Sequence, residues 1–272
     1  MGAGSDFYVE PLDATFGAVV RGLRLAEVGE EAVERLYAAW VEPGLLIFPE
    51  LPLPDDEQLA FAHRFGALEF PLAPISNQRP DGSLRDENDL DDDVVKILKG
   101  NLGWHADSTY VPVQAKAAVF SARVVPSRGG ETEWADMRAA YDALDPAMRE
   151  RAEKLAAHHS IAWSQARLGY APPPEGSDYG QYGFDVGSAP FRPLVKVHPE
   201  TARRSHLIGR HAHAIPGLSP EESERLLDEL VEWACQPPRV VRHAWSVGDA
   251  VIWDNRCLLH RGRPWDLREP RT

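Results

Sequence analysis

Apolar residues along this chain fall mainly into short runs, and most of these runs have the length and composition of β-strands. Residues 44–49 form a compact apolar run that ends at a proline, which indicates a buried strand, and residues 250–253 form another run after a Gly-Asp turn. Further strands are predicted at residues 7–9, 17–25, 117–125, 131–134, 189–197, 205–209 and 239–245. The pattern predicts a mainly β fold with peripheral helices, a sandwich of jelly-roll type.

Helical spacing of apolar residues appears between these strands. Residues 30–40 predict an amphipathic helix, and acidic residues at 55–57 begin another, whose expected buried face is Leu59, Phe61, Ala62 and Phe65. Asp136 is expected to cap a helix through residue 144, and residues 149–158 are expected to be helical. Ser219 is a strong helix cap followed by Pro220 at the first position, with an expected apolar face of Leu226, Leu227, Leu230 and Trp233.

Periodicity disappears between residues 75 and 93, where an acidic run at 86–93 indicates a solvated loop. Because this segment leads directly into the histidine-containing stretch at 100–110, a lid over a binding site is the alternative interpretation. No linker or internal repeat is visible. Residues 1–272 are therefore predicted to form one domain, with a mobile lid loop at about 75–100 and an insertion at about 165–190.

Composition narrows the classes of partner and the cellular setting. A formal net charge of −13 disfavours nucleic acid and anionic membrane surfaces, because both require a basic face. No run approaches the roughly 20 apolar residues of a membrane helix, and the first residues do not resemble a signal peptide. The two cysteines, Cys235 and Cys257, form neither a disulfide framework nor a cysteine-rich zinc site, which favours a reducing cytoplasm.

The strongest candidate for chemistry is the pair His105 and Asp107. If this stretch is extended, residues two apart project from the same face, so the imidazole and the carboxylate point together. His260 would complete a facial triad of two histidines and one carboxylate, which leaves metal positions open for substrate. Arg271 follows eleven residues later and could bind a carboxylate cosubstrate with two hydrogen bonds.

Other polar clusters keep alternatives open. His211 and His213 could pair on a strand face and serve a cupin-type metal hydrolase or isomerase, and a non-catalytic binding jelly roll is a further alternative. Asp254 and Asn255 are expected to brace the turn before His260 rather than to contact a metal, because such side chains readily bond neighbouring backbone.

Longer blocks around these residues resemble one family. The chain resembles the Fe(II)/2-oxoglutarate-dependent dioxygenases of the taurine dioxygenase family, and within it the phenoxyalkanoate enzymes of the 2,4-dichlorophenoxyacetate and (S)-dichlorprop type. The matching blocks are residues 104–110 (WHADSTY), 129–132 (GGET), 135–144 (ADMRAAYDAL), 207–213 (LIGRHAH) and 253–261 (WDNRCLLHR). The likeness extends over nearly the whole chain.

The resemblance implies a site and a fold. His105, Asp107 and His260 would bind the iron, and Thr132 and Arg271 would bind the far carboxylate of 2-oxoglutarate. The fold would be a double-stranded β-helix, which is a distorted jelly roll. The cofactors would be Fe(II), 2-oxoglutarate and O₂, with ascorbate helpful in vitro, and the enzyme would form a homo-oligomer, as relatives commonly do.

The implied reaction is hydroxylation of a C–H bond next to the ether oxygen of an aryloxyalkanoate-like acid, which yields a phenol, a carbonyl acid, succinate and CO₂. A sulfonate, a sulfate ester or a secondary-metabolite precursor remains an alternative substrate. The relatives continue past the position of Arg271 with further basic residues, which in some members contact the substrate's anionic group, and a substrate-anchoring residue of that kind would be absent from residues 1–272. Candidates within this chain for binding the substrate's anionic group are Lys96, Lys99, Asn101, His198, Arg210 and His211.

Overall fold

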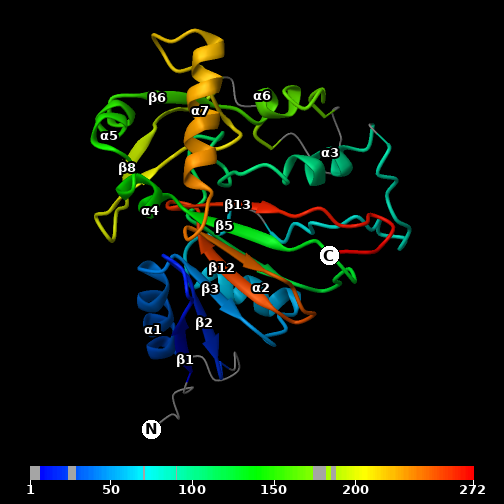
Figure 1. The fold of residues 1–272 in the computed structure, drawn as a ribbon. Coiled ribbons are helices and arrows are strands. Elements are labelled where there is room, and N and C mark those ends of the chain that lie inside the picture. The colour runs from blue at the N-terminus through cyan, green and yellow to red at the C-terminus, as the bar shows by residue number, and fades with distance from the viewer. Residues whose placement is uncertain (1–6, 24–28, 70, 90, 174–181, 185–187) are drawn as a thin grey trace.

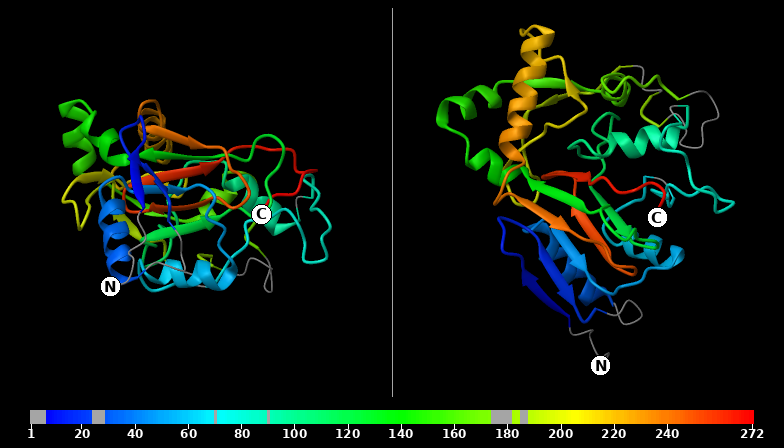
Figure 2. Two further views of the ribbon diagram at one scale, coloured as in Figure 1. Left: turned by 90° about the horizontal axis from the view of Figure 1, so that it is seen from below. Right: turned by 45° about the vertical axis from the view of Figure 1, so that its right-hand side comes forward.

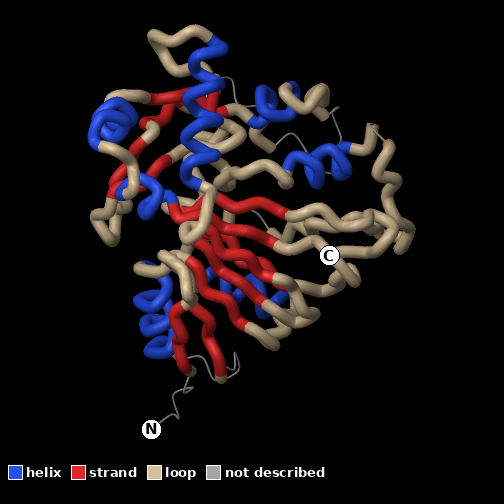
Figure 3. Tube along the Cα trace, viewed as in Figure 1, coloured by secondary structure: helices blue, strands red, loops and turns tan. Residues whose placement is uncertain are grey.

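Strands occupy the middle of the molecule and helices lie toward the outside, as the computed structural model in Figure 3 shows. The structure describes residues 7–23, 29–69, 71–89, 91–173, 182–184 and 188–272. The predicted mainly β fold with peripheral helices is therefore confirmed. No helix in these ranges is long and apolar enough to cross a membrane.

The largest sheet has the strand order β1-β2-β3-β12-β4. Its strands are β1 (Tyr8–Pro11), β2 (Ala18–Arg21), β3 (Leu45–Phe48), β12 (Ala250–Asp254) and β4 (Ala117–Ser121). β2 and β3 are parallel and the other neighbours are antiparallel. The first and last parts of the chain thus meet in one sheet, which Figure 1 shows in blue and orange.

A second, antiparallel sheet has the order β11-β5-β13. Its strands are β11 (Val240–His243), β5 (Thr132–Asp136) and β13 (Leu258–Gly262). Since β12 belongs to the first sheet and β13 to the second, the turn at residues 255–257 carries the chain from one sheet to the other. Smaller sheets pair β10 (Ala212–His213), β6 (Ala156–His159) and β7 (Phe191–Pro193), and β8 (Val195–Val197) with β9 (Arg204–His206).

Burial on both faces explains the continuous apolar runs of β3 and β12. Alternate residues of a strand point to opposite faces, so Leu45 and Ile47 pack against the second sheet with Trp134 and Leu258. Leu46 and Phe48 point the other way, toward the helices. The same alternation places Val251 and Trp253 between the two sheets. A strand covered on both faces has no polar side to show in its sequence.

Helices cover the outer faces of the strands. They are α1 (Glu30–Val41), α2 (Asp55–His63), α3 (Asp93–Gly100), α4 (Met137–Asp142), α5 (Pro146–Glu153), α6 (Ile161–Ala166) and α7 (Pro220–Ala234). α7 begins with the full capping box expected at Ser219, whose hydroxyl accepts from the Glu222 N–H while the Glu222 carboxylate accepts in return. Leu226, Leu227 and Leu230 are buried as predicted, but Trp233 is 41% exposed and does not belong to that face.

Three sequence predictions need correction. The helix expected at 149–158 ends at Glu153, because Ala156–His159 forms a strand that pairs with β7 and β10. On α2, Phe61 is buried but Leu59 and Ala62 are only partly so. The acidic run is not uniformly solvated: the Asp92 side chain is buried, pairs with Arg79 and Arg85, and caps α3. Part of the insertion expected at 165–190, residues 174–181 and 185–187, lies outside the described residues.

Candidate active site

His105 and His260 are brought together by a short backbone pairing. The N–H of each residue donates to the carbonyl oxygen of the other, at 3.0 and 2.7 Å. Residue 105 thus lies along the edge of β13 that β5 does not occupy, and the two imidazole centroids are 4.1 Å apart. His260 lies opposite Trp134 in the ladder, on the same strand face as Leu258, so its ring points between the two sheets.

Asp107 completes the cluster from a turn, so the extended conformation considered for residues 105–107 does not continue through Asp107. Its Oδ1 lies 3.9 Å from His105 Nε2 and 3.5 Å from His260 Nε2. Each of the three residues offers a ligand atom within 4.8 Å of the others. The chain reverses directly afterwards at Ser108, which has a positive φ of 56°. Two imidazoles and one carboxylate therefore converge, and they make up the donor set of a facial triad.

The protonation state of this cluster suits a divalent metal. Burial lowers the pKa of both His105 and His260 to about 3, so the two imidazoles are neutral, which is the form that binds metals. His105 Nδ1 lies 2.7 Å from the Gly103 carbonyl, so Nδ1 carries the proton and Nε2 keeps its lone pair. Burial raises the pKa of Asp107, while His105 and the Asn255 amide act in the opposite direction.

Thr132 and Arg271, the residues expected to bind a carboxylate, line the same cavity as the cluster. Thr132 faces Gly262 in the ladder between β5 and β13, on the strand face of Trp134. Arg271 is held by its backbone N–H, which donates to Asn77 Oδ1, and by Nε, which donates to the Gly130 carbonyl. Figure 2 shows this C-terminal segment in red beside residues 75–85.

The cation of Arg271 is available for an acidic ligand. Burial lowers the pKa of Arg271, and no carboxylate among the described residues forms an ion pair with it. Gly130 leaves room for this side chain: its φ is +70°, and a Cβ there would lie 3.1 Å from Arg271 Nε. Sequence reasoning missed Trp245, whose Nε1–H donates to Thr132 Oγ1 at 3.0 Å. The Thr132 hydroxyl proton is thereby left to donate to a ligand.

One cavity of about 740 Å³ connects these groups. Its lining includes the three clustered residues, Thr132 and Arg271, together with apolar residues of β4 and α2. Asn101, Arg210 and His211 line it as well.

Arg210 is a second partly buried cation in this cavity. Its Nη2 donates to the side-chain oxygen of Gln165 at 2.9 Å, and no acidic partner for it occurs in the described part of the chain. Burial lowers the pKa of Arg210 to about 10, which leaves it charged at neutral pH. The neighbouring His211 is neutral, because burial and Arg210 lower its pKa, and its Nδ1 lies 2.9 Å from Ser164 Oγ.

The remaining substrate-binding candidates lie elsewhere. Lys96 pairs with Asp93, Lys99 donates to the Glu87 carbonyl, and neither side chain lines the cavity. His198 is fully buried against Asp254, away from the cavity lining. His213 stacks on Trp163, and among the described residues neither His211 nor His213 belongs to a group of three side chains close enough to hold a metal.

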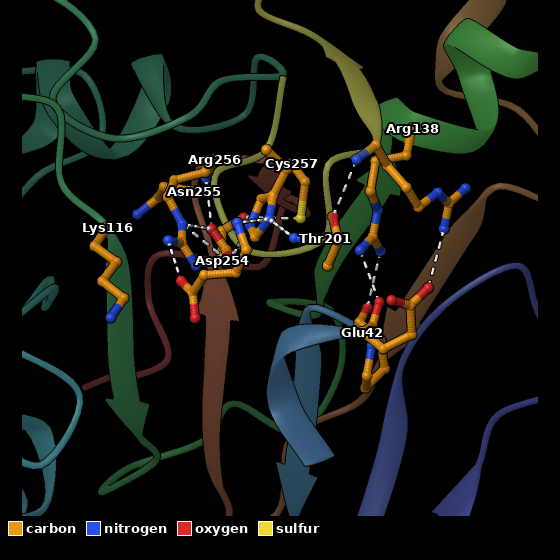
Figure 4. A network of polar contacts seen from close by, with 12 residues as sticks. Glu42, Lys116, Arg138, Thr201, Asp254, Asn255, Arg256 and Cys257 are labelled. Carbon is orange, nitrogen blue, oxygen red and sulfur yellow. Dashed lines mark hydrogen bonds and ion pairs between the residues drawn. The ribbon is translucent and has the colours of Figure 1, made fainter. Parts of the chain in front are cut away.

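The turn before His260 is braced as expected, and Figure 4 shows it. Asp254 accepts from the backbone N–H of Arg256 at 2.8 Å and from its guanidinium. His198 Nδ1 accepts from two backbone N–H groups, so its Nε2 carries the proton and donates to Asp254 at 3.0 Å. Although His198, Asp254 and Cys257 lie close enough for a metal, the histidine has no free lone pair, and this cluster is structural.

A polar network that the sequence did not reveal lies at the cavity wall. Ser108 Oγ lies 3.0 Å from Glu69 Oε2 and 2.8 Å from the Tyr182 hydroxyl, which also donates to Glu69. Tyr182 belongs to the expected insertion, so this network connects the described part of that insertion to the residue next to Asp107. All three side chains line the cavity.

The site and fold agree with known proteins. Residues 8–272 match the model of the family described as "Taurine catabolism dioxygenase TauD, TfdA family", and the chain belongs to this family of dioxygenases. It is 61% identical to the (S)-phenoxypropionate/alpha-ketoglutarate-dioxygenase of Sphingobium herbicidovorans, over 97% of this chain and 92% of that protein. It is 53% identical to the enzyme of the same name from Delftia acidovorans, with the same coverage.

A solved structure provides the corresponding likeness in three dimensions. The crystal structure of AAD-2 in complex with Mn(II) and N-oxalylglycine matches with a TM-score of 0.89 and 35% sequence identity, over 98% of this chain and 94% of that chain. The family resemblance stated from the motifs is therefore confirmed.

Proposed function

We propose that this enzyme is an Fe(II)- and 2-oxoglutarate-dependent dioxygenase that hydroxylates the C–H next to the ether oxygen of an aryloxyalkanoic acid, with a phenoxypropionate as the representative substrate. One observation carries the proposal: two partly buried arginines without acidic partners among the described residues, Arg271 and Arg210, line the same cavity as the cluster of His105, Asp107 and His260. One cation suits the cosubstrate and the other suits an acidic substrate. The names of the relatives support the same substrate class.

The residues present fit the cofactors. His105, Asp107 and His260 would hold the iron, and Thr132 with Arg271 would bind the far carboxylate of 2-oxoglutarate. Together with 2-oxoglutarate and O₂, the bound iron supplies C–H hydroxylation, with succinate and CO₂ as coproducts. Because the hydroxylated carbon carries an aryloxy group, the resulting hemiacetal separates into a phenol and a carbonyl acid.

The protein's own residues orient the substrate and exclude water. Arg210 would bind the substrate carboxylate, while apolar residues of β4 and α2 receive the aryl group. The ring centroids of the neutral His211 and of Tyr110 lie 4.8 Å apart, and both residues line this cavity. The carboxylates of the cosubstrate and of the substrate would lie against Arg271 and Arg210 inside this cavity. Each ion pair is stronger there than in water, because the dielectric constant is lower.

The scaffold that we propose for this chemistry is the double-stranded β-helix, within one domain. The apolar cluster shared by β3, β12, β5 and β13 supports two facing sheets, and the turn at 255–257 passes between them. We further propose a cytoplasmic setting, which the free thiols of Cys235 and Cys257 support.

The direct test is succinate release in the presence of Fe(II), 2-oxoglutarate and O₂. We expect turnover with a phenoxypropionate, together with release of the phenol, and no turnover when 2-oxoglutarate is omitted. The screen should include both enantiomers, phenoxyacetate, taurine and an alkyl sulfate. Turnover that persists without 2-oxoglutarate would exclude a dioxygenase, and activity on taurine or the sulfate ester alone would refute the aryloxyalkanoate assignment.

Arg210→Met tests the substrate end of the cavity. We expect KM for the phenoxypropionate to rise about 10- to 100-fold, which corresponds to the loss of about 1.5–3 kcal/mol from a charged hydrogen bond. KM for 2-oxoglutarate should stay near its wild-type value, because Arg271 is intact. Arg225→Met, at an exposed position on α7, is the matched control. Equal effects on both KM values would contradict a role specific to the substrate.

A further inference from the structure

We propose that Asn255 is a positioning residue that determines which oxygen of Asp107 faces the metal. The inference rests on the proposed function, since it concerns the same metal site. Asn255 is 1% exposed and comes from the turn between β12 and β13, far in sequence from Asp107. Its amide makes contacts with both the backbone and the side chain of Asp107.

The orientation of the amide follows from its partners. Its Oδ1 accepts the Asp107 backbone N–H at 3.2 Å and the Trp253 Nε1–H at 3.1 Å. Both partners are donors only, so the amide atom that faces them must be oxygen. Nδ2 is therefore on the opposite side, where it donates to Asp107 Oδ2 at 3.2 Å.

Because of this hydrogen bond, the two carboxylate oxygens of Asp107 have different partners. Oδ2 is occupied by the Asn255 amide, while Oδ1 lies within 3.9 Å of both histidine Nε2 atoms. A carboxylate held in this way presents one oxygen to the metal and keeps the other away from it. The amide thus fixes the rotation of Asp107 about its terminal bond, which packing alone leaves broad.

Asn255 can orient Asp107 because its own backbone is held on both sides. Its N–H donates to the Lys116 carbonyl at 3.0 Å, and its carbonyl accepts from Gln114 Nε2 at 2.9 Å. The preceding Asp254 donates its N–H to the Gly44 carbonyl at 2.8 Å and is bound by Arg256, as Figure 4 shows. The amide therefore acts from a fixed position.

A role limited to bracing the turn makes a different prediction. If Asn255 only kept the turn folded, loosening the same turn elsewhere would harm the metal site equally. Arg256 provides that comparison, because it binds Asp254 and Glu200 but does not contact Asp107. The two residues therefore separate orientation of the ligand from stability of the turn.

The test measures Mn(II) affinity by electron paramagnetic resonance of the free ion, together with the thermal unfolding midpoint of the metal-free protein. We expect Asn255→Leu, which is similar in volume but cannot hydrogen-bond, to weaken Mn(II) binding about 10- to 100-fold. Asn255→Ser, too short to reach both groups of Asp107, should shift affinity in the same direction. Arg256→Met should lower the unfolding midpoint but leave Mn(II) affinity within about threefold of wild type.

The proposal is overturned if both Asn255 variants bind Mn(II) within about twofold of wild type, or if Arg256→Met loses as much affinity as Asn255→Leu. Wild type and His260→Ala are measured in parallel to separate this result from failure of the proposed function. If wild type shows no His260-dependent binding, both the metal site and this inference fall. If wild type binds through His260 and the Asn255 variants match it, only the inference falls.

Discussion

His260→Ala is expected to abolish stable metal binding and to lower kcat/KM by at least about 10³-fold, because the metal contributes several kcal/mol of transition-state stabilisation. His260 is one of three residues that offer ligand atoms to the same point, and its imidazole is neutral and buried. The measurements are Mn(II) binding and succinate release. The variant should still fold, since the backbone pairing of residues 105 and 260 does not use the side chain.

Two other histidines serve as controls for this result. His63, exposed at the end of α2, reports on any general effect of replacing a histidine. His206 is 2% exposed but does not line the cavity, so His206→Ala reports on the loss of a buried imidazole. Both variants should bind Mn(II) as wild type does, and His260→Ala binding with wild-type affinity would remove the basis of the metal site.

Arg138→Met is expected to destabilise the fold by about 3–5 kcal/mol, the usual cost of leaving one member of a buried ion pair alone. Arg138 and Asp136 are both fully buried, and Nε donates to Oδ1 at 2.9 Å. The guanidinium also donates to the carbonyls of Glu42 and Pro43, and so joins the α1–β3 connection to the start of α4 (Figure 4). Urea unfolding with linear extrapolation measures the change.

The double variant Asp136→Asn/Arg138→Met tests the cause of this loss. An asparagine side chain at this position would keep the helix cap without the charge, so no buried carboxylate is left uncompensated. We expect the double variant to regain at least about 1 kcal/mol relative to Arg138→Met, within the range of coupling between contacting residues. Strictly additive losses would mean that lost packing, and not the unpaired charge, is responsible.

Local signals in the sequence predicted most of the framework. The apolar runs at 44–49 and 250–253 and the cap at Ser219 each depend on residues within a few positions, and the structure confirms a strand in each run and the cap. Residues 156–159 were mispredicted because pairing with two distant strands outweighs the helical preference of their alanines. Helix α3 was missed although Asp92 supplied a recognisable cap next to Val94, Val95 and Leu98.

The residues of the candidate site likewise include some that the sequence could predict and others that it could not. His105, Asp107, His260 and Arg271 could be proposed from residue type and spacing, and Thr132 from the family resemblance. The structure brings all five to one cavity. The contacts of Trp245 with Thr132 and of Asn255 with Asp107 join residues more than a hundred positions apart. No spacing rule within a single sequence reveals such pairs. Lys96, Lys99 and His198 show the converse, since their side chains found partners outside the cavity.

The reciprocal hydrogen bonds between residues 105 and 260 cannot form during synthesis until β13 has been made. A nascent chain from which β13 has not yet emerged contains His105 and Asp107 but lacks His260 and the strand against which residue 105 pairs. The three side chains therefore come together only after this late strand has emerged.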